Sequence, residues 1–110
     1  NVAGGLISTP DDLVKFYRLH SLRGRIGAKQ LIPETVIAKL YEKQPGKREY
    51  GLGFNLFGNA VVGHGGASGT IGSVDLKNDR VVVILTQAGS TAARPLMERG
   101  TKLAREILAE

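Results

Sequence analysis

The segment from Asn59 to Ser68 reads Asn-Ala-Val-Val-Gly-His-Gly-Gly-Ala-Ser. Its small and β-preferring residues lead directly into His64. The next two residues, Gly65 and Gly66, carry no side chains, and a glycine inside a strand often marks a close approach to the backbone. An imidazole beside exposed backbone amides suits the wall of a hydrolase site, where it would move protons next to oxyanion donors. The alternative interpretation is a glycine-rich turn with an incidental histidine.

On both sides of this segment, apolar residues follow the pattern of β-strands. Every second residue from Leu52 to Leu56 would share one face of a strand. The run from Val81 to Leu85 is apolar on both faces, which is typical of a central strand covered on both sides. Short turns at Gly58-Asn59 and Asn78-Asp79 predict antiparallel pairing. The expected strands are 50–57, 60–68, 71–77 and 80–87.

A helix is predicted over residues 10–22. Thr9 can cap it, Pro10 fits its first position, and Asp12 completes an approximate capping box. His20 lies near its end on the apolar face, and we interpret it as a partly packed histidine rather than a ligand.

Two further helices are predicted. One begins at Pro33-Glu34 and ends at Gln44-Pro45-Gly46, and the other covers 95–109. In the latter, Gly100 could allow close contact with the sheet. Residues 21–30 and 90–94 are expected to be loops. The fold class is therefore α+β: an antiparallel sheet of three to four strands with helices packed on it, in a single unit over residues 1–110.

The composition excludes several kinds of site. With no cysteine among 110 residues, neither a disulfide nor a thiolate metal site can form. The two histidines, His20 and His64, share no carboxylate cluster, so no metal and no other cofactor is expected. The net charge is +5, but the cations are scattered, and we expect a solvated basic face rather than a nucleic-acid partner. No apolar run is long enough for a membrane segment.

Four pieces of the sequence, taken in order, resemble one known family. They are Ala3-Gly4-Gly5-Leu6-Ile7-Ser8-Thr9-Pro10-Asp11-Asp12-Leu13, Tyr50-Gly51-Leu52-Gly53-Phe54, Gly63-His64-Gly65-Gly66 and the strand ending Leu85-Thr86-Gln87. Together they resemble the C-terminal part of the serine β-lactamase and penicillin-binding-protein superfamily, closest to class C β-lactamases, D-alanyl-D-alanine peptidases and their esterase relatives. The resemblance covers nearly the whole chain and implies a partial β-lactamase/transpeptidase-like fold.

The resemblance also implies roles for the central segment. The family's third motif, Lys-Thr-Gly or His-x-Gly on a strand beside the cleft, would be His64-Gly65-Gly66. His64 would position substrate and assist proton movement, and the backbone N–H of Ala67 would be an oxyanion-hole donor. Gly65, Gly66 and Ser68 would contact the substrate, which would be a small molecule or a peptide. Gly65 replaces a hydroxyl residue of many β-lactamases, so peptidase and esterase activities stay open.

Two motifs of that family do not occur in these residues. No serine has a lysine three positions on, and no tyrosine has an asparagine two positions on, so Ser-x-x-Lys and Tyr-x-Asn are absent. Both lie N-terminal to the matching part in the family. We therefore expect a C-terminal fragment that is inactive by itself and whose partner is the N-terminal part of the parent enzyme. The resemblance implies a bacterial periplasmic or secreted location.

Other hypotheses remain beside the hydrolase fragment. The chain could be a non-catalytic binding or interaction module with the same fold, or a small enzyme that uses His64 with Ser68 or Ser73. In the parent fold, the strand at 80–87 would pair with a strand of the N-terminal part. In this chain its bare apolar edge predicts self-association or a marginally stable monomer.

Overall fold

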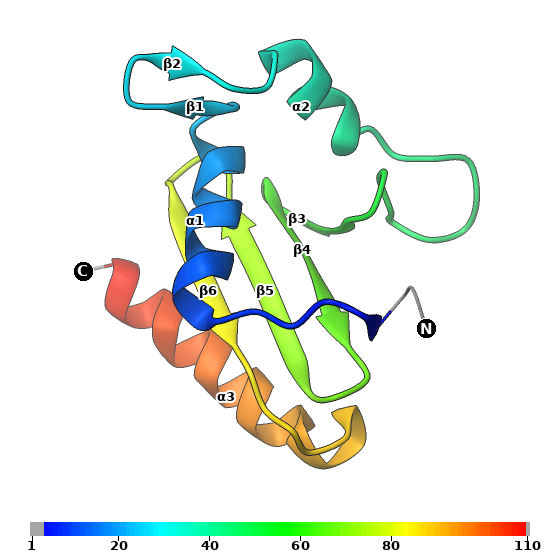
Figure 1. The fold of residues 1–110 in the computed structure, drawn as a ribbon. Helices are drawn as coiled ribbons and strands as arrows, with labels where there is room; N and C mark the ends of the chain where they lie inside the picture. The colour runs from blue at the N-terminus through cyan, green and yellow to red at the C-terminus, as the bar shows by residue number, and fades with distance from the viewer. Residues whose placement is uncertain (1–3, 110) are drawn as a thin grey trace.

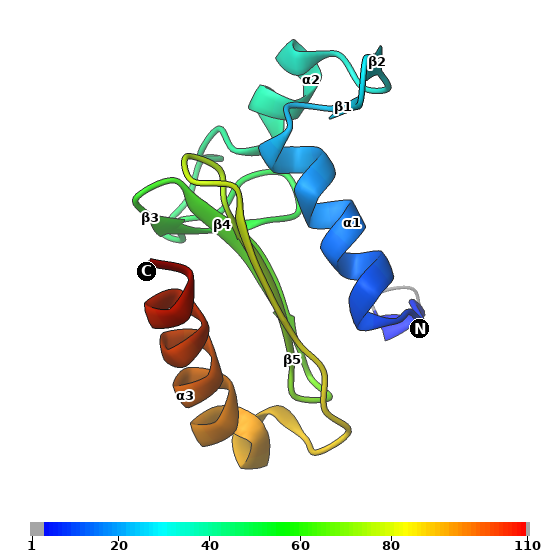
Figure 2. The same cartoon turned by 90° about the vertical axis from the view of Figure 1, so that its left-hand side faces the viewer.

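The computed structural model describes residues 4–109 and shows a four-stranded antiparallel sheet between two helices (Figure 1). The sheet has the strand order β3-β4-β5-β6. Helix α1 lies on one face of it and α3 on the other (Figure 2). The predicted α+β class is confirmed. The elements are α1 (Pro10–Ser21), β1 (Arg25–Ile26), β2 (Lys29–Gln30), α2 (Glu34–Leu40), β3 (Asn55–Gly58), β4 (Val61–Gly66), β5 (Thr70–Asp75), β6 (Arg80–Ile84) and α3 (Ser90–Ala109).

The strand before the central segment is shorter than predicted. β3 begins at Asn55, so the expectation of a strand from residue 50 was wrong. The N–H of Gly51 donates to the carbonyl of Phe54 at 2.8 Å, and Gly53 has a φ of +89°. These residues form a turn, which buries Phe54 but leaves Leu52 about half exposed. The alternating apolar residues Leu52 and Phe54 therefore lie in a glycine turn and not in a strand.

Both predicted hairpin turns are shifted. β3 and β4 are joined by Asn59 and Ala60, with φ of 52° and 62°, as in a type I′ turn. The turn between β5 and β6 spans residues 76–79 instead of two residues, because Asp75 pairs with Arg80. There the carboxylate of Asp75 accepts hydrogen bonds from backbone N–H groups inside the turn, which stabilise the longer loop.

Strand β6 lies at the edge of the sheet, and within residues 4–109 no strand pairs with its outer side. Helices α1 and α3 both contact it, and Val82 at its centre is buried. The predicted coverage of both faces is therefore confirmed, whereas its predicted central place is not found in this sheet. An apolar sequence pattern indicates that both faces of a strand are covered, but it does not indicate whether the strand has a neighbour on each side.

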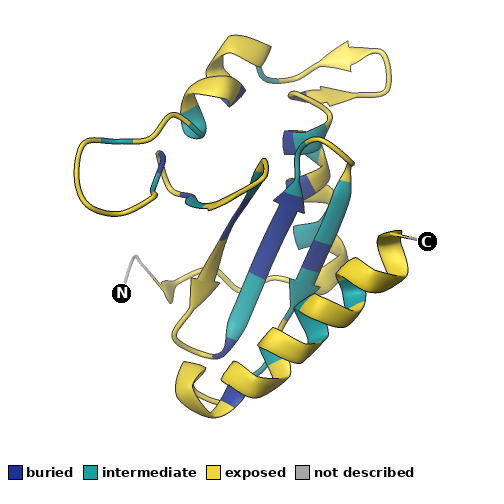
Figure 3. Cartoon of the chain, turned by 180° about the vertical axis from the view of Figure 1, so that it is seen from behind, coloured by how far each residue is buried: buried dark blue, intermediate teal, exposed yellow. Residues whose placement is uncertain are grey.

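Helix α1 is capped and packed as the sequence predicted. The hydroxyl of Thr9 accepts a hydrogen bond from the N–H of Asp12 at 3.2 Å, and Pro10 occupies the first turn. Tyr17 projects from this helix into the core and lies over Gly72. The core consists of Tyr17, Phe54, Val62 and Val74, and the buried strand residues are seen in Figure 3.

The other helices differ from prediction at their ends. Helix α2 ends at Leu40, before the predicted stop at Gln44-Pro45-Gly46. Helix α3 begins at Ser90, so the predicted loop over 90–94 is wrong; Pro95 lies inside the helix, where it removes one intrahelical hydrogen bond. The predicted close approach of Gly100 is confirmed, because a Cβ there would lie 2.8 Å from Cδ1 of Ile84.

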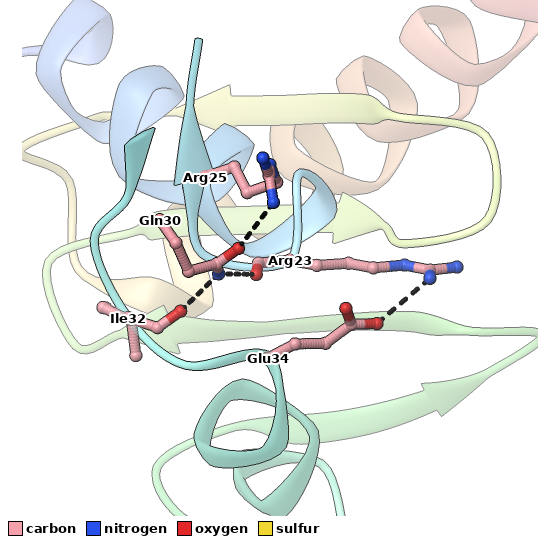
Figure 4. A network of polar contacts seen from close by, with 5 residues as sticks. All are labelled: Arg23, Arg25, Gln30, Ile32 and Glu34. Atoms are coloured by element: carbon pink, nitrogen blue, oxygen red, sulfur yellow. Dashed lines mark hydrogen bonds and ion pairs between the residues drawn. The ribbon is translucent and has the colours of Figure 1, made fainter. Parts of the chain in front are cut away.

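The predicted loop at 21–30 contains the small hairpin β1–β2. The side-chain amide of Gln30 donates to the carbonyls of Arg23 (2.8 Å) and Ile32 (2.6 Å), and its oxygen accepts from Arg25 (Figure 4). Arg23 forms an ion pair with Glu34 at 3.0 Å. Two arginines of the predicted basic face are therefore engaged by contacts in this hairpin and with the start of α2.

His20 is a structural residue, as predicted, and is only 4% exposed. Its Nδ1 contacts the hydroxyl of Tyr41, and its ring lies edge-on to those of Phe16 and Phe54. Burial lowers the pKa of His20 below its ordinary 6.5 and raises that of Tyr41. The neutral imidazole therefore accepts a hydrogen bond from the Tyr41 hydroxyl.

This arrangement predicts a loss of stability in mild acid. Below about pH 6.5 the unfolded chain protonates His20 and the folded chain resists it, so the free energy of unfolding falls with decreasing pH until the lowered folded pKa is passed. The slope should be at most about 1.4 kcal/mol per pH unit. Urea unfolding between pH 7.5 and 5 measures it. His20→Gln should remove the slope and His64→Gln should retain it; equal slopes in both variants would contradict the assignment.

Candidate active site

The central segment places His64 on β4, opposite Gly72 of β5. Paired residues of neighbouring antiparallel strands project on the same side of the sheet, so both lie on the face that α1 covers. The Tyr17 ring occupies the space over Gly72, and a Cβ at Gly72 would overlap it. His64 itself is exposed. Helix α1 therefore contacts the sheet next to His64 and leaves the His64 side chain exposed.

Two contacts orient the ring of His64. Its Nδ1 lies 2.6 Å from the carbonyl oxygen of Gly65, and the ring of Tyr50 meets it edge-on with centroids 5.8 Å apart. A carbonyl can only accept, so Nδ1 carries the hydrogen, and the neutral imidazole keeps its lone pair on Nε2. No residue of 4–109 hydrogen-bonds to Nε2. The ring can therefore accept a proton or a hydrogen bond from a ligand.

The turn after β4 is fixed through its carbonyl groups. The N–H of Gly69, which has a φ of +74°, donates to the carbonyl of Gly66 at 3.1 Å. The hydroxyl of Thr86 donates to the carbonyls of Ser68 (3.1 Å) and Gly69 (2.8 Å). The turn is thereby held against the segment that leads from β6 to α3.

The amide of Ala67 lies in the same turn. Its carbonyl accepts a hydrogen bond from the N–H of Ser90 at 2.9 Å, which fixes the turn against the first residue of α3. Its own N–H has no acceptor within residues 4–109, and the residue is exposed. A fixed, unengaged amide is the kind of donor that an oxyanion hole requires. This geometry is compatible with the role predicted for Ala67, which stays a prediction.

The two glycines of the motif also have a packing role. A Cβ at Gly66 would collide with the hydroxyl of Thr70, and one at Gly65 would lie 3.3 Å from the Thr70 carbonyl. Both residues are exposed, so their backbone stays accessible from solvent. Substrate contact by Gly65, Gly66 and Ser68 remains a prediction. The tight β4–β5 turn is by itself a sufficient reason for a glycine at position 66.

Neither serine proposed for a small enzyme is hydrogen-bonded to His64 in the described chain. Ser73 is 3% exposed and follows Gly72 in β5, so it projects on the opposite face from His64. There it lines a cavity of about 700 Å³ between the sheet and α3. Covalent catalysis needs the nucleophile within reach of its base, and Ser73 does not meet this requirement.

Sequence reasoning missed the pocket in which His64 lies. Its volume is about 460 Å³, and its walls come from the loop before β3, from β3 and from β4. Lys43, Lys47 and Arg48 lie close together in the sequence and were a signal, but the basic residues were interpreted only as a solvated face. The lining residues are Gln44, Pro45, Gly46, Lys47, Arg48, Tyr50, Asn55 and His64.

Residues 4–109 contain no group of three or more His, Cys, Asp or Glu side chains placed to hold a metal ion. Over the same range, none of the helices combines the length and apolar character needed to cross a bilayer.

Comparison with known proteins identifies the family. The family model described as Beta-lactamase matches residues 2–106, which is nearly the entire chain. Searches of curated proteins and of solved structures gave no significant match. The family match and the four-stranded antiparallel sheet with its packed helices agree with the resemblance carried by the Gly63–Gly66 motif. The chain therefore belongs to the β-lactamase family.

Proposed function

We propose that this chain forms one wall of the catalytic cleft of a β-lactamase-type serine hydrolase and that a segment outside these 110 residues supplies the nucleophile. The supporting observation is the pairing of an oriented His64, with Nε2 unengaged in the described chain, and the accessible N–H of Ala67 three residues later. Family membership and the absence of Ser-x-x-Lys and Tyr-x-Asn from the sequence agree with this proposal. The substrate is a β-lactam, a D-alanyl peptide or an ester.

In this proposal the two groups act at different stages of acyl transfer. The serine oxygen attacks the carbonyl carbon, and the carbonyl oxygen gains the negative charge that the Ala67 N–H stabilises. His64 holds the substrate and assists proton movement as the leaving group departs and water releases the acyl group. Neither group can start the reaction, because the anion forms only after a nucleophile attacks.

The proposal predicts that the isolated chain hydrolyses no chromogenic cephalosporin, D-alanyl peptide or short-chain ester above the buffer rate. It also predicts no covalent adduct with a labelled penicillin by mass spectrometry. A longer polypeptide of the same gene that includes a Ser-x-x-Lys segment should form the adduct and turn over.

Turnover by the isolated chain that Ser68→Ala abolishes and Ser8→Ala leaves intact would overturn the proposal in favour of a small enzyme. If the longer polypeptide forms no adduct and hydrolyses none of these substrates, the hydrolase proposal fails and the binding-module hypothesis is favoured. Pairing of the β6 edge with the missing segment, or with a second copy of the chain, is part of the same proposal.

A further inference from the structure

Thr86 lies far from the His64 motif in the sequence but contacts the turn that follows it. Its half-buried side chain comes just after β6. The hydroxyl oxygen lies 3.1 Å from the carbonyl oxygen of Ser68 and 2.8 Å from that of Gly69. A hydroxyl group has a single hydrogen, so the two carbonyls share it. The turn after β4 is therefore held by a side chain from another strand.

Two planar peptide groups connect this hydroxyl to the N–H of Ala67. The carbonyl of Ser68 and the N–H of Gly69 belong to one peptide group, so fixing the first fixes the direction of the second. That N–H donates to the carbonyl of Gly66 at 3.1 Å. The carbonyl of Gly66 in turn shares its rigid plane with the N–H of Ala67. The contact of Thr86 therefore also restrains the direction in which the Ala67 N–H points.

The surroundings of Thr86 hold its hydroxyl in this position. The N–H of Ala88 donates to the hydroxyl oxygen at 3.4 Å, which leaves the hydroxyl hydrogen for the two carbonyls. Gly69 is buried with a φ of +74°, and a Cβ there would overlap the Thr86 hydroxyl and lie 2.5 Å from Cβ of Ala93. The close approach therefore requires glycine at position 69 and leaves the turn little room to shift.

We propose that Thr86 is a positioning residue for the reaction of the proposed function, because its hydroxyl orients the Ala67 N–H toward the oxyanion. An oxyanion donor is effective only where the negative charge develops, so a displaced N–H stabilises the transition state less. Thr86 acts through the turn and not on the reacting atoms. This inference rests on the proposed function for the reaction, but the restraint on the Ala67 amide can be measured without it.

The kinetic test uses the longer polypeptide that includes the Ser-x-x-Lys segment. Thr86→Val removes the hydroxyl and keeps the branched shape, and it should lower the rate constant of acylation by a labelled penicillin about 10- to 100-fold. The dissociation constant of the non-covalent complex should change less than about threefold, since no oxyanion exists before attack. Thr86→Ser keeps the hydroxyl and should recover most of the acylation rate. Rates are compared at a temperature where urea unfolding shows each variant to be folded.

A second measurement uses the isolated chain and needs no nucleophile. The ¹⁵N order parameter of the Ala67 amide should stay near the rigid-backbone value of about 0.85 in the parent and fall toward about 0.6 in Thr86→Val. Thr101→Val is the matched control, because it makes the same change at a half-buried threonine of α3. It should alter neither the order parameter nor the acylation rate.

Three results would overturn the positioning role: acylation of Thr86→Val at the parental rate, no recovery in Thr86→Ser, or an equal loss in Thr101→Val. An unchanged Ala67 order parameter in Thr86→Val would reject the restraint itself. Failure of the proposed function shows separately, as the absence of any adduct in the longer polypeptide with Thr86 intact. The order parameter then still decides whether Thr86 holds the turn.

Discussion

Replacing His64 with alanine should lower turnover about 100-fold or more in a polypeptide that carries the nucleophile, which is the scale of a general acid–base contribution. The imidazole is exposed, its Nδ1 is engaged by the Gly65 carbonyl, and its Nε2 is available to a substrate. The fold should survive, because the His64 side chain is exposed and its ring packs edge-on against Tyr50 at the surface. We expect the free energy of unfolding to change by less than about 0.5 kcal/mol, as for most surface substitutions.

The measurements are steady-state turnover of a chromogenic cephalosporin, the rate of acylation by a labelled penicillin and urea unfolding of the same preparations. His64→Lys is the matched variant, since the third motif of the family that the chain resembles begins with either lysine or histidine, and it should recover part of the lost turnover. If His64→Ala turns over at the parental rate, the histidine has no part in the chemistry. If the loss of turnover is accompanied by a large fall in the free energy of unfolding, His64 has a structural role instead.

Gly72→Ala should be among the most damaging single-methyl changes in the sheet. A Cβ at Gly72 would overlap the buried Tyr17 ring and lie 2.7 Å from its hydroxyl oxygen. Overpacking a core costs about 1–3 kcal/mol, and we expect the upper end because the ring is held between α1 and the sheet. For a domain of this size, about 3 kcal/mol lowers the melting temperature by roughly 12–24 °C.

Thermal unfolding measures this effect, and two variants assign its cause. Gly89→Ala is the control: its Cβ would meet no atom closer than 4.0 Å, and its cost should stay below about 1 kcal/mol. In a Tyr17→Leu background the cost of Gly72→Ala should fall by more than half, because two groups that collide are energetically coupled. Strictly additive costs would refute the collision.

Local patterns predicted much of the fold. The Thr9 cap, the β4–β5 pair and the helices α1 and α3 follow from side-chain period and end signals in neighbouring residues. The errors lie where distant contacts decide the conformation. Gly51 packs so closely against the carbonyl of Leu40 that a Cβ there would collide with it. This contact with a distant part of the chain accompanies a turn after Tyr50, where the alternating pattern predicted a strand.

The candidate site likewise contains residues that the sequence identifies and residues that only distant contacts bring there. His64, Gly65, Gly66 and Ala67 are adjacent in sequence, so one motif identifies them all. Lys47 and Arg48 reach the same pocket only because their loop is tied down by backbone hydrogen bonds to Tyr50 and from Leu56. No property of the residues 44–50 by themselves indicates that closure.

The strand order β3-β4-β5-β6 has a consequence for the rate of folding. Every strand pairs with the next strand in the chain, across turns at residues 59–60, 67–69 and 76–79. Closing such short loops costs little chain entropy, and single hairpins form in about 1–10 μs. The contact of Tyr17 with Gly72 instead joins distant parts of the chain. Since distant contacts slow folding, the docking of α1 onto a formed sheet, rather than strand pairing, should set the folding rate.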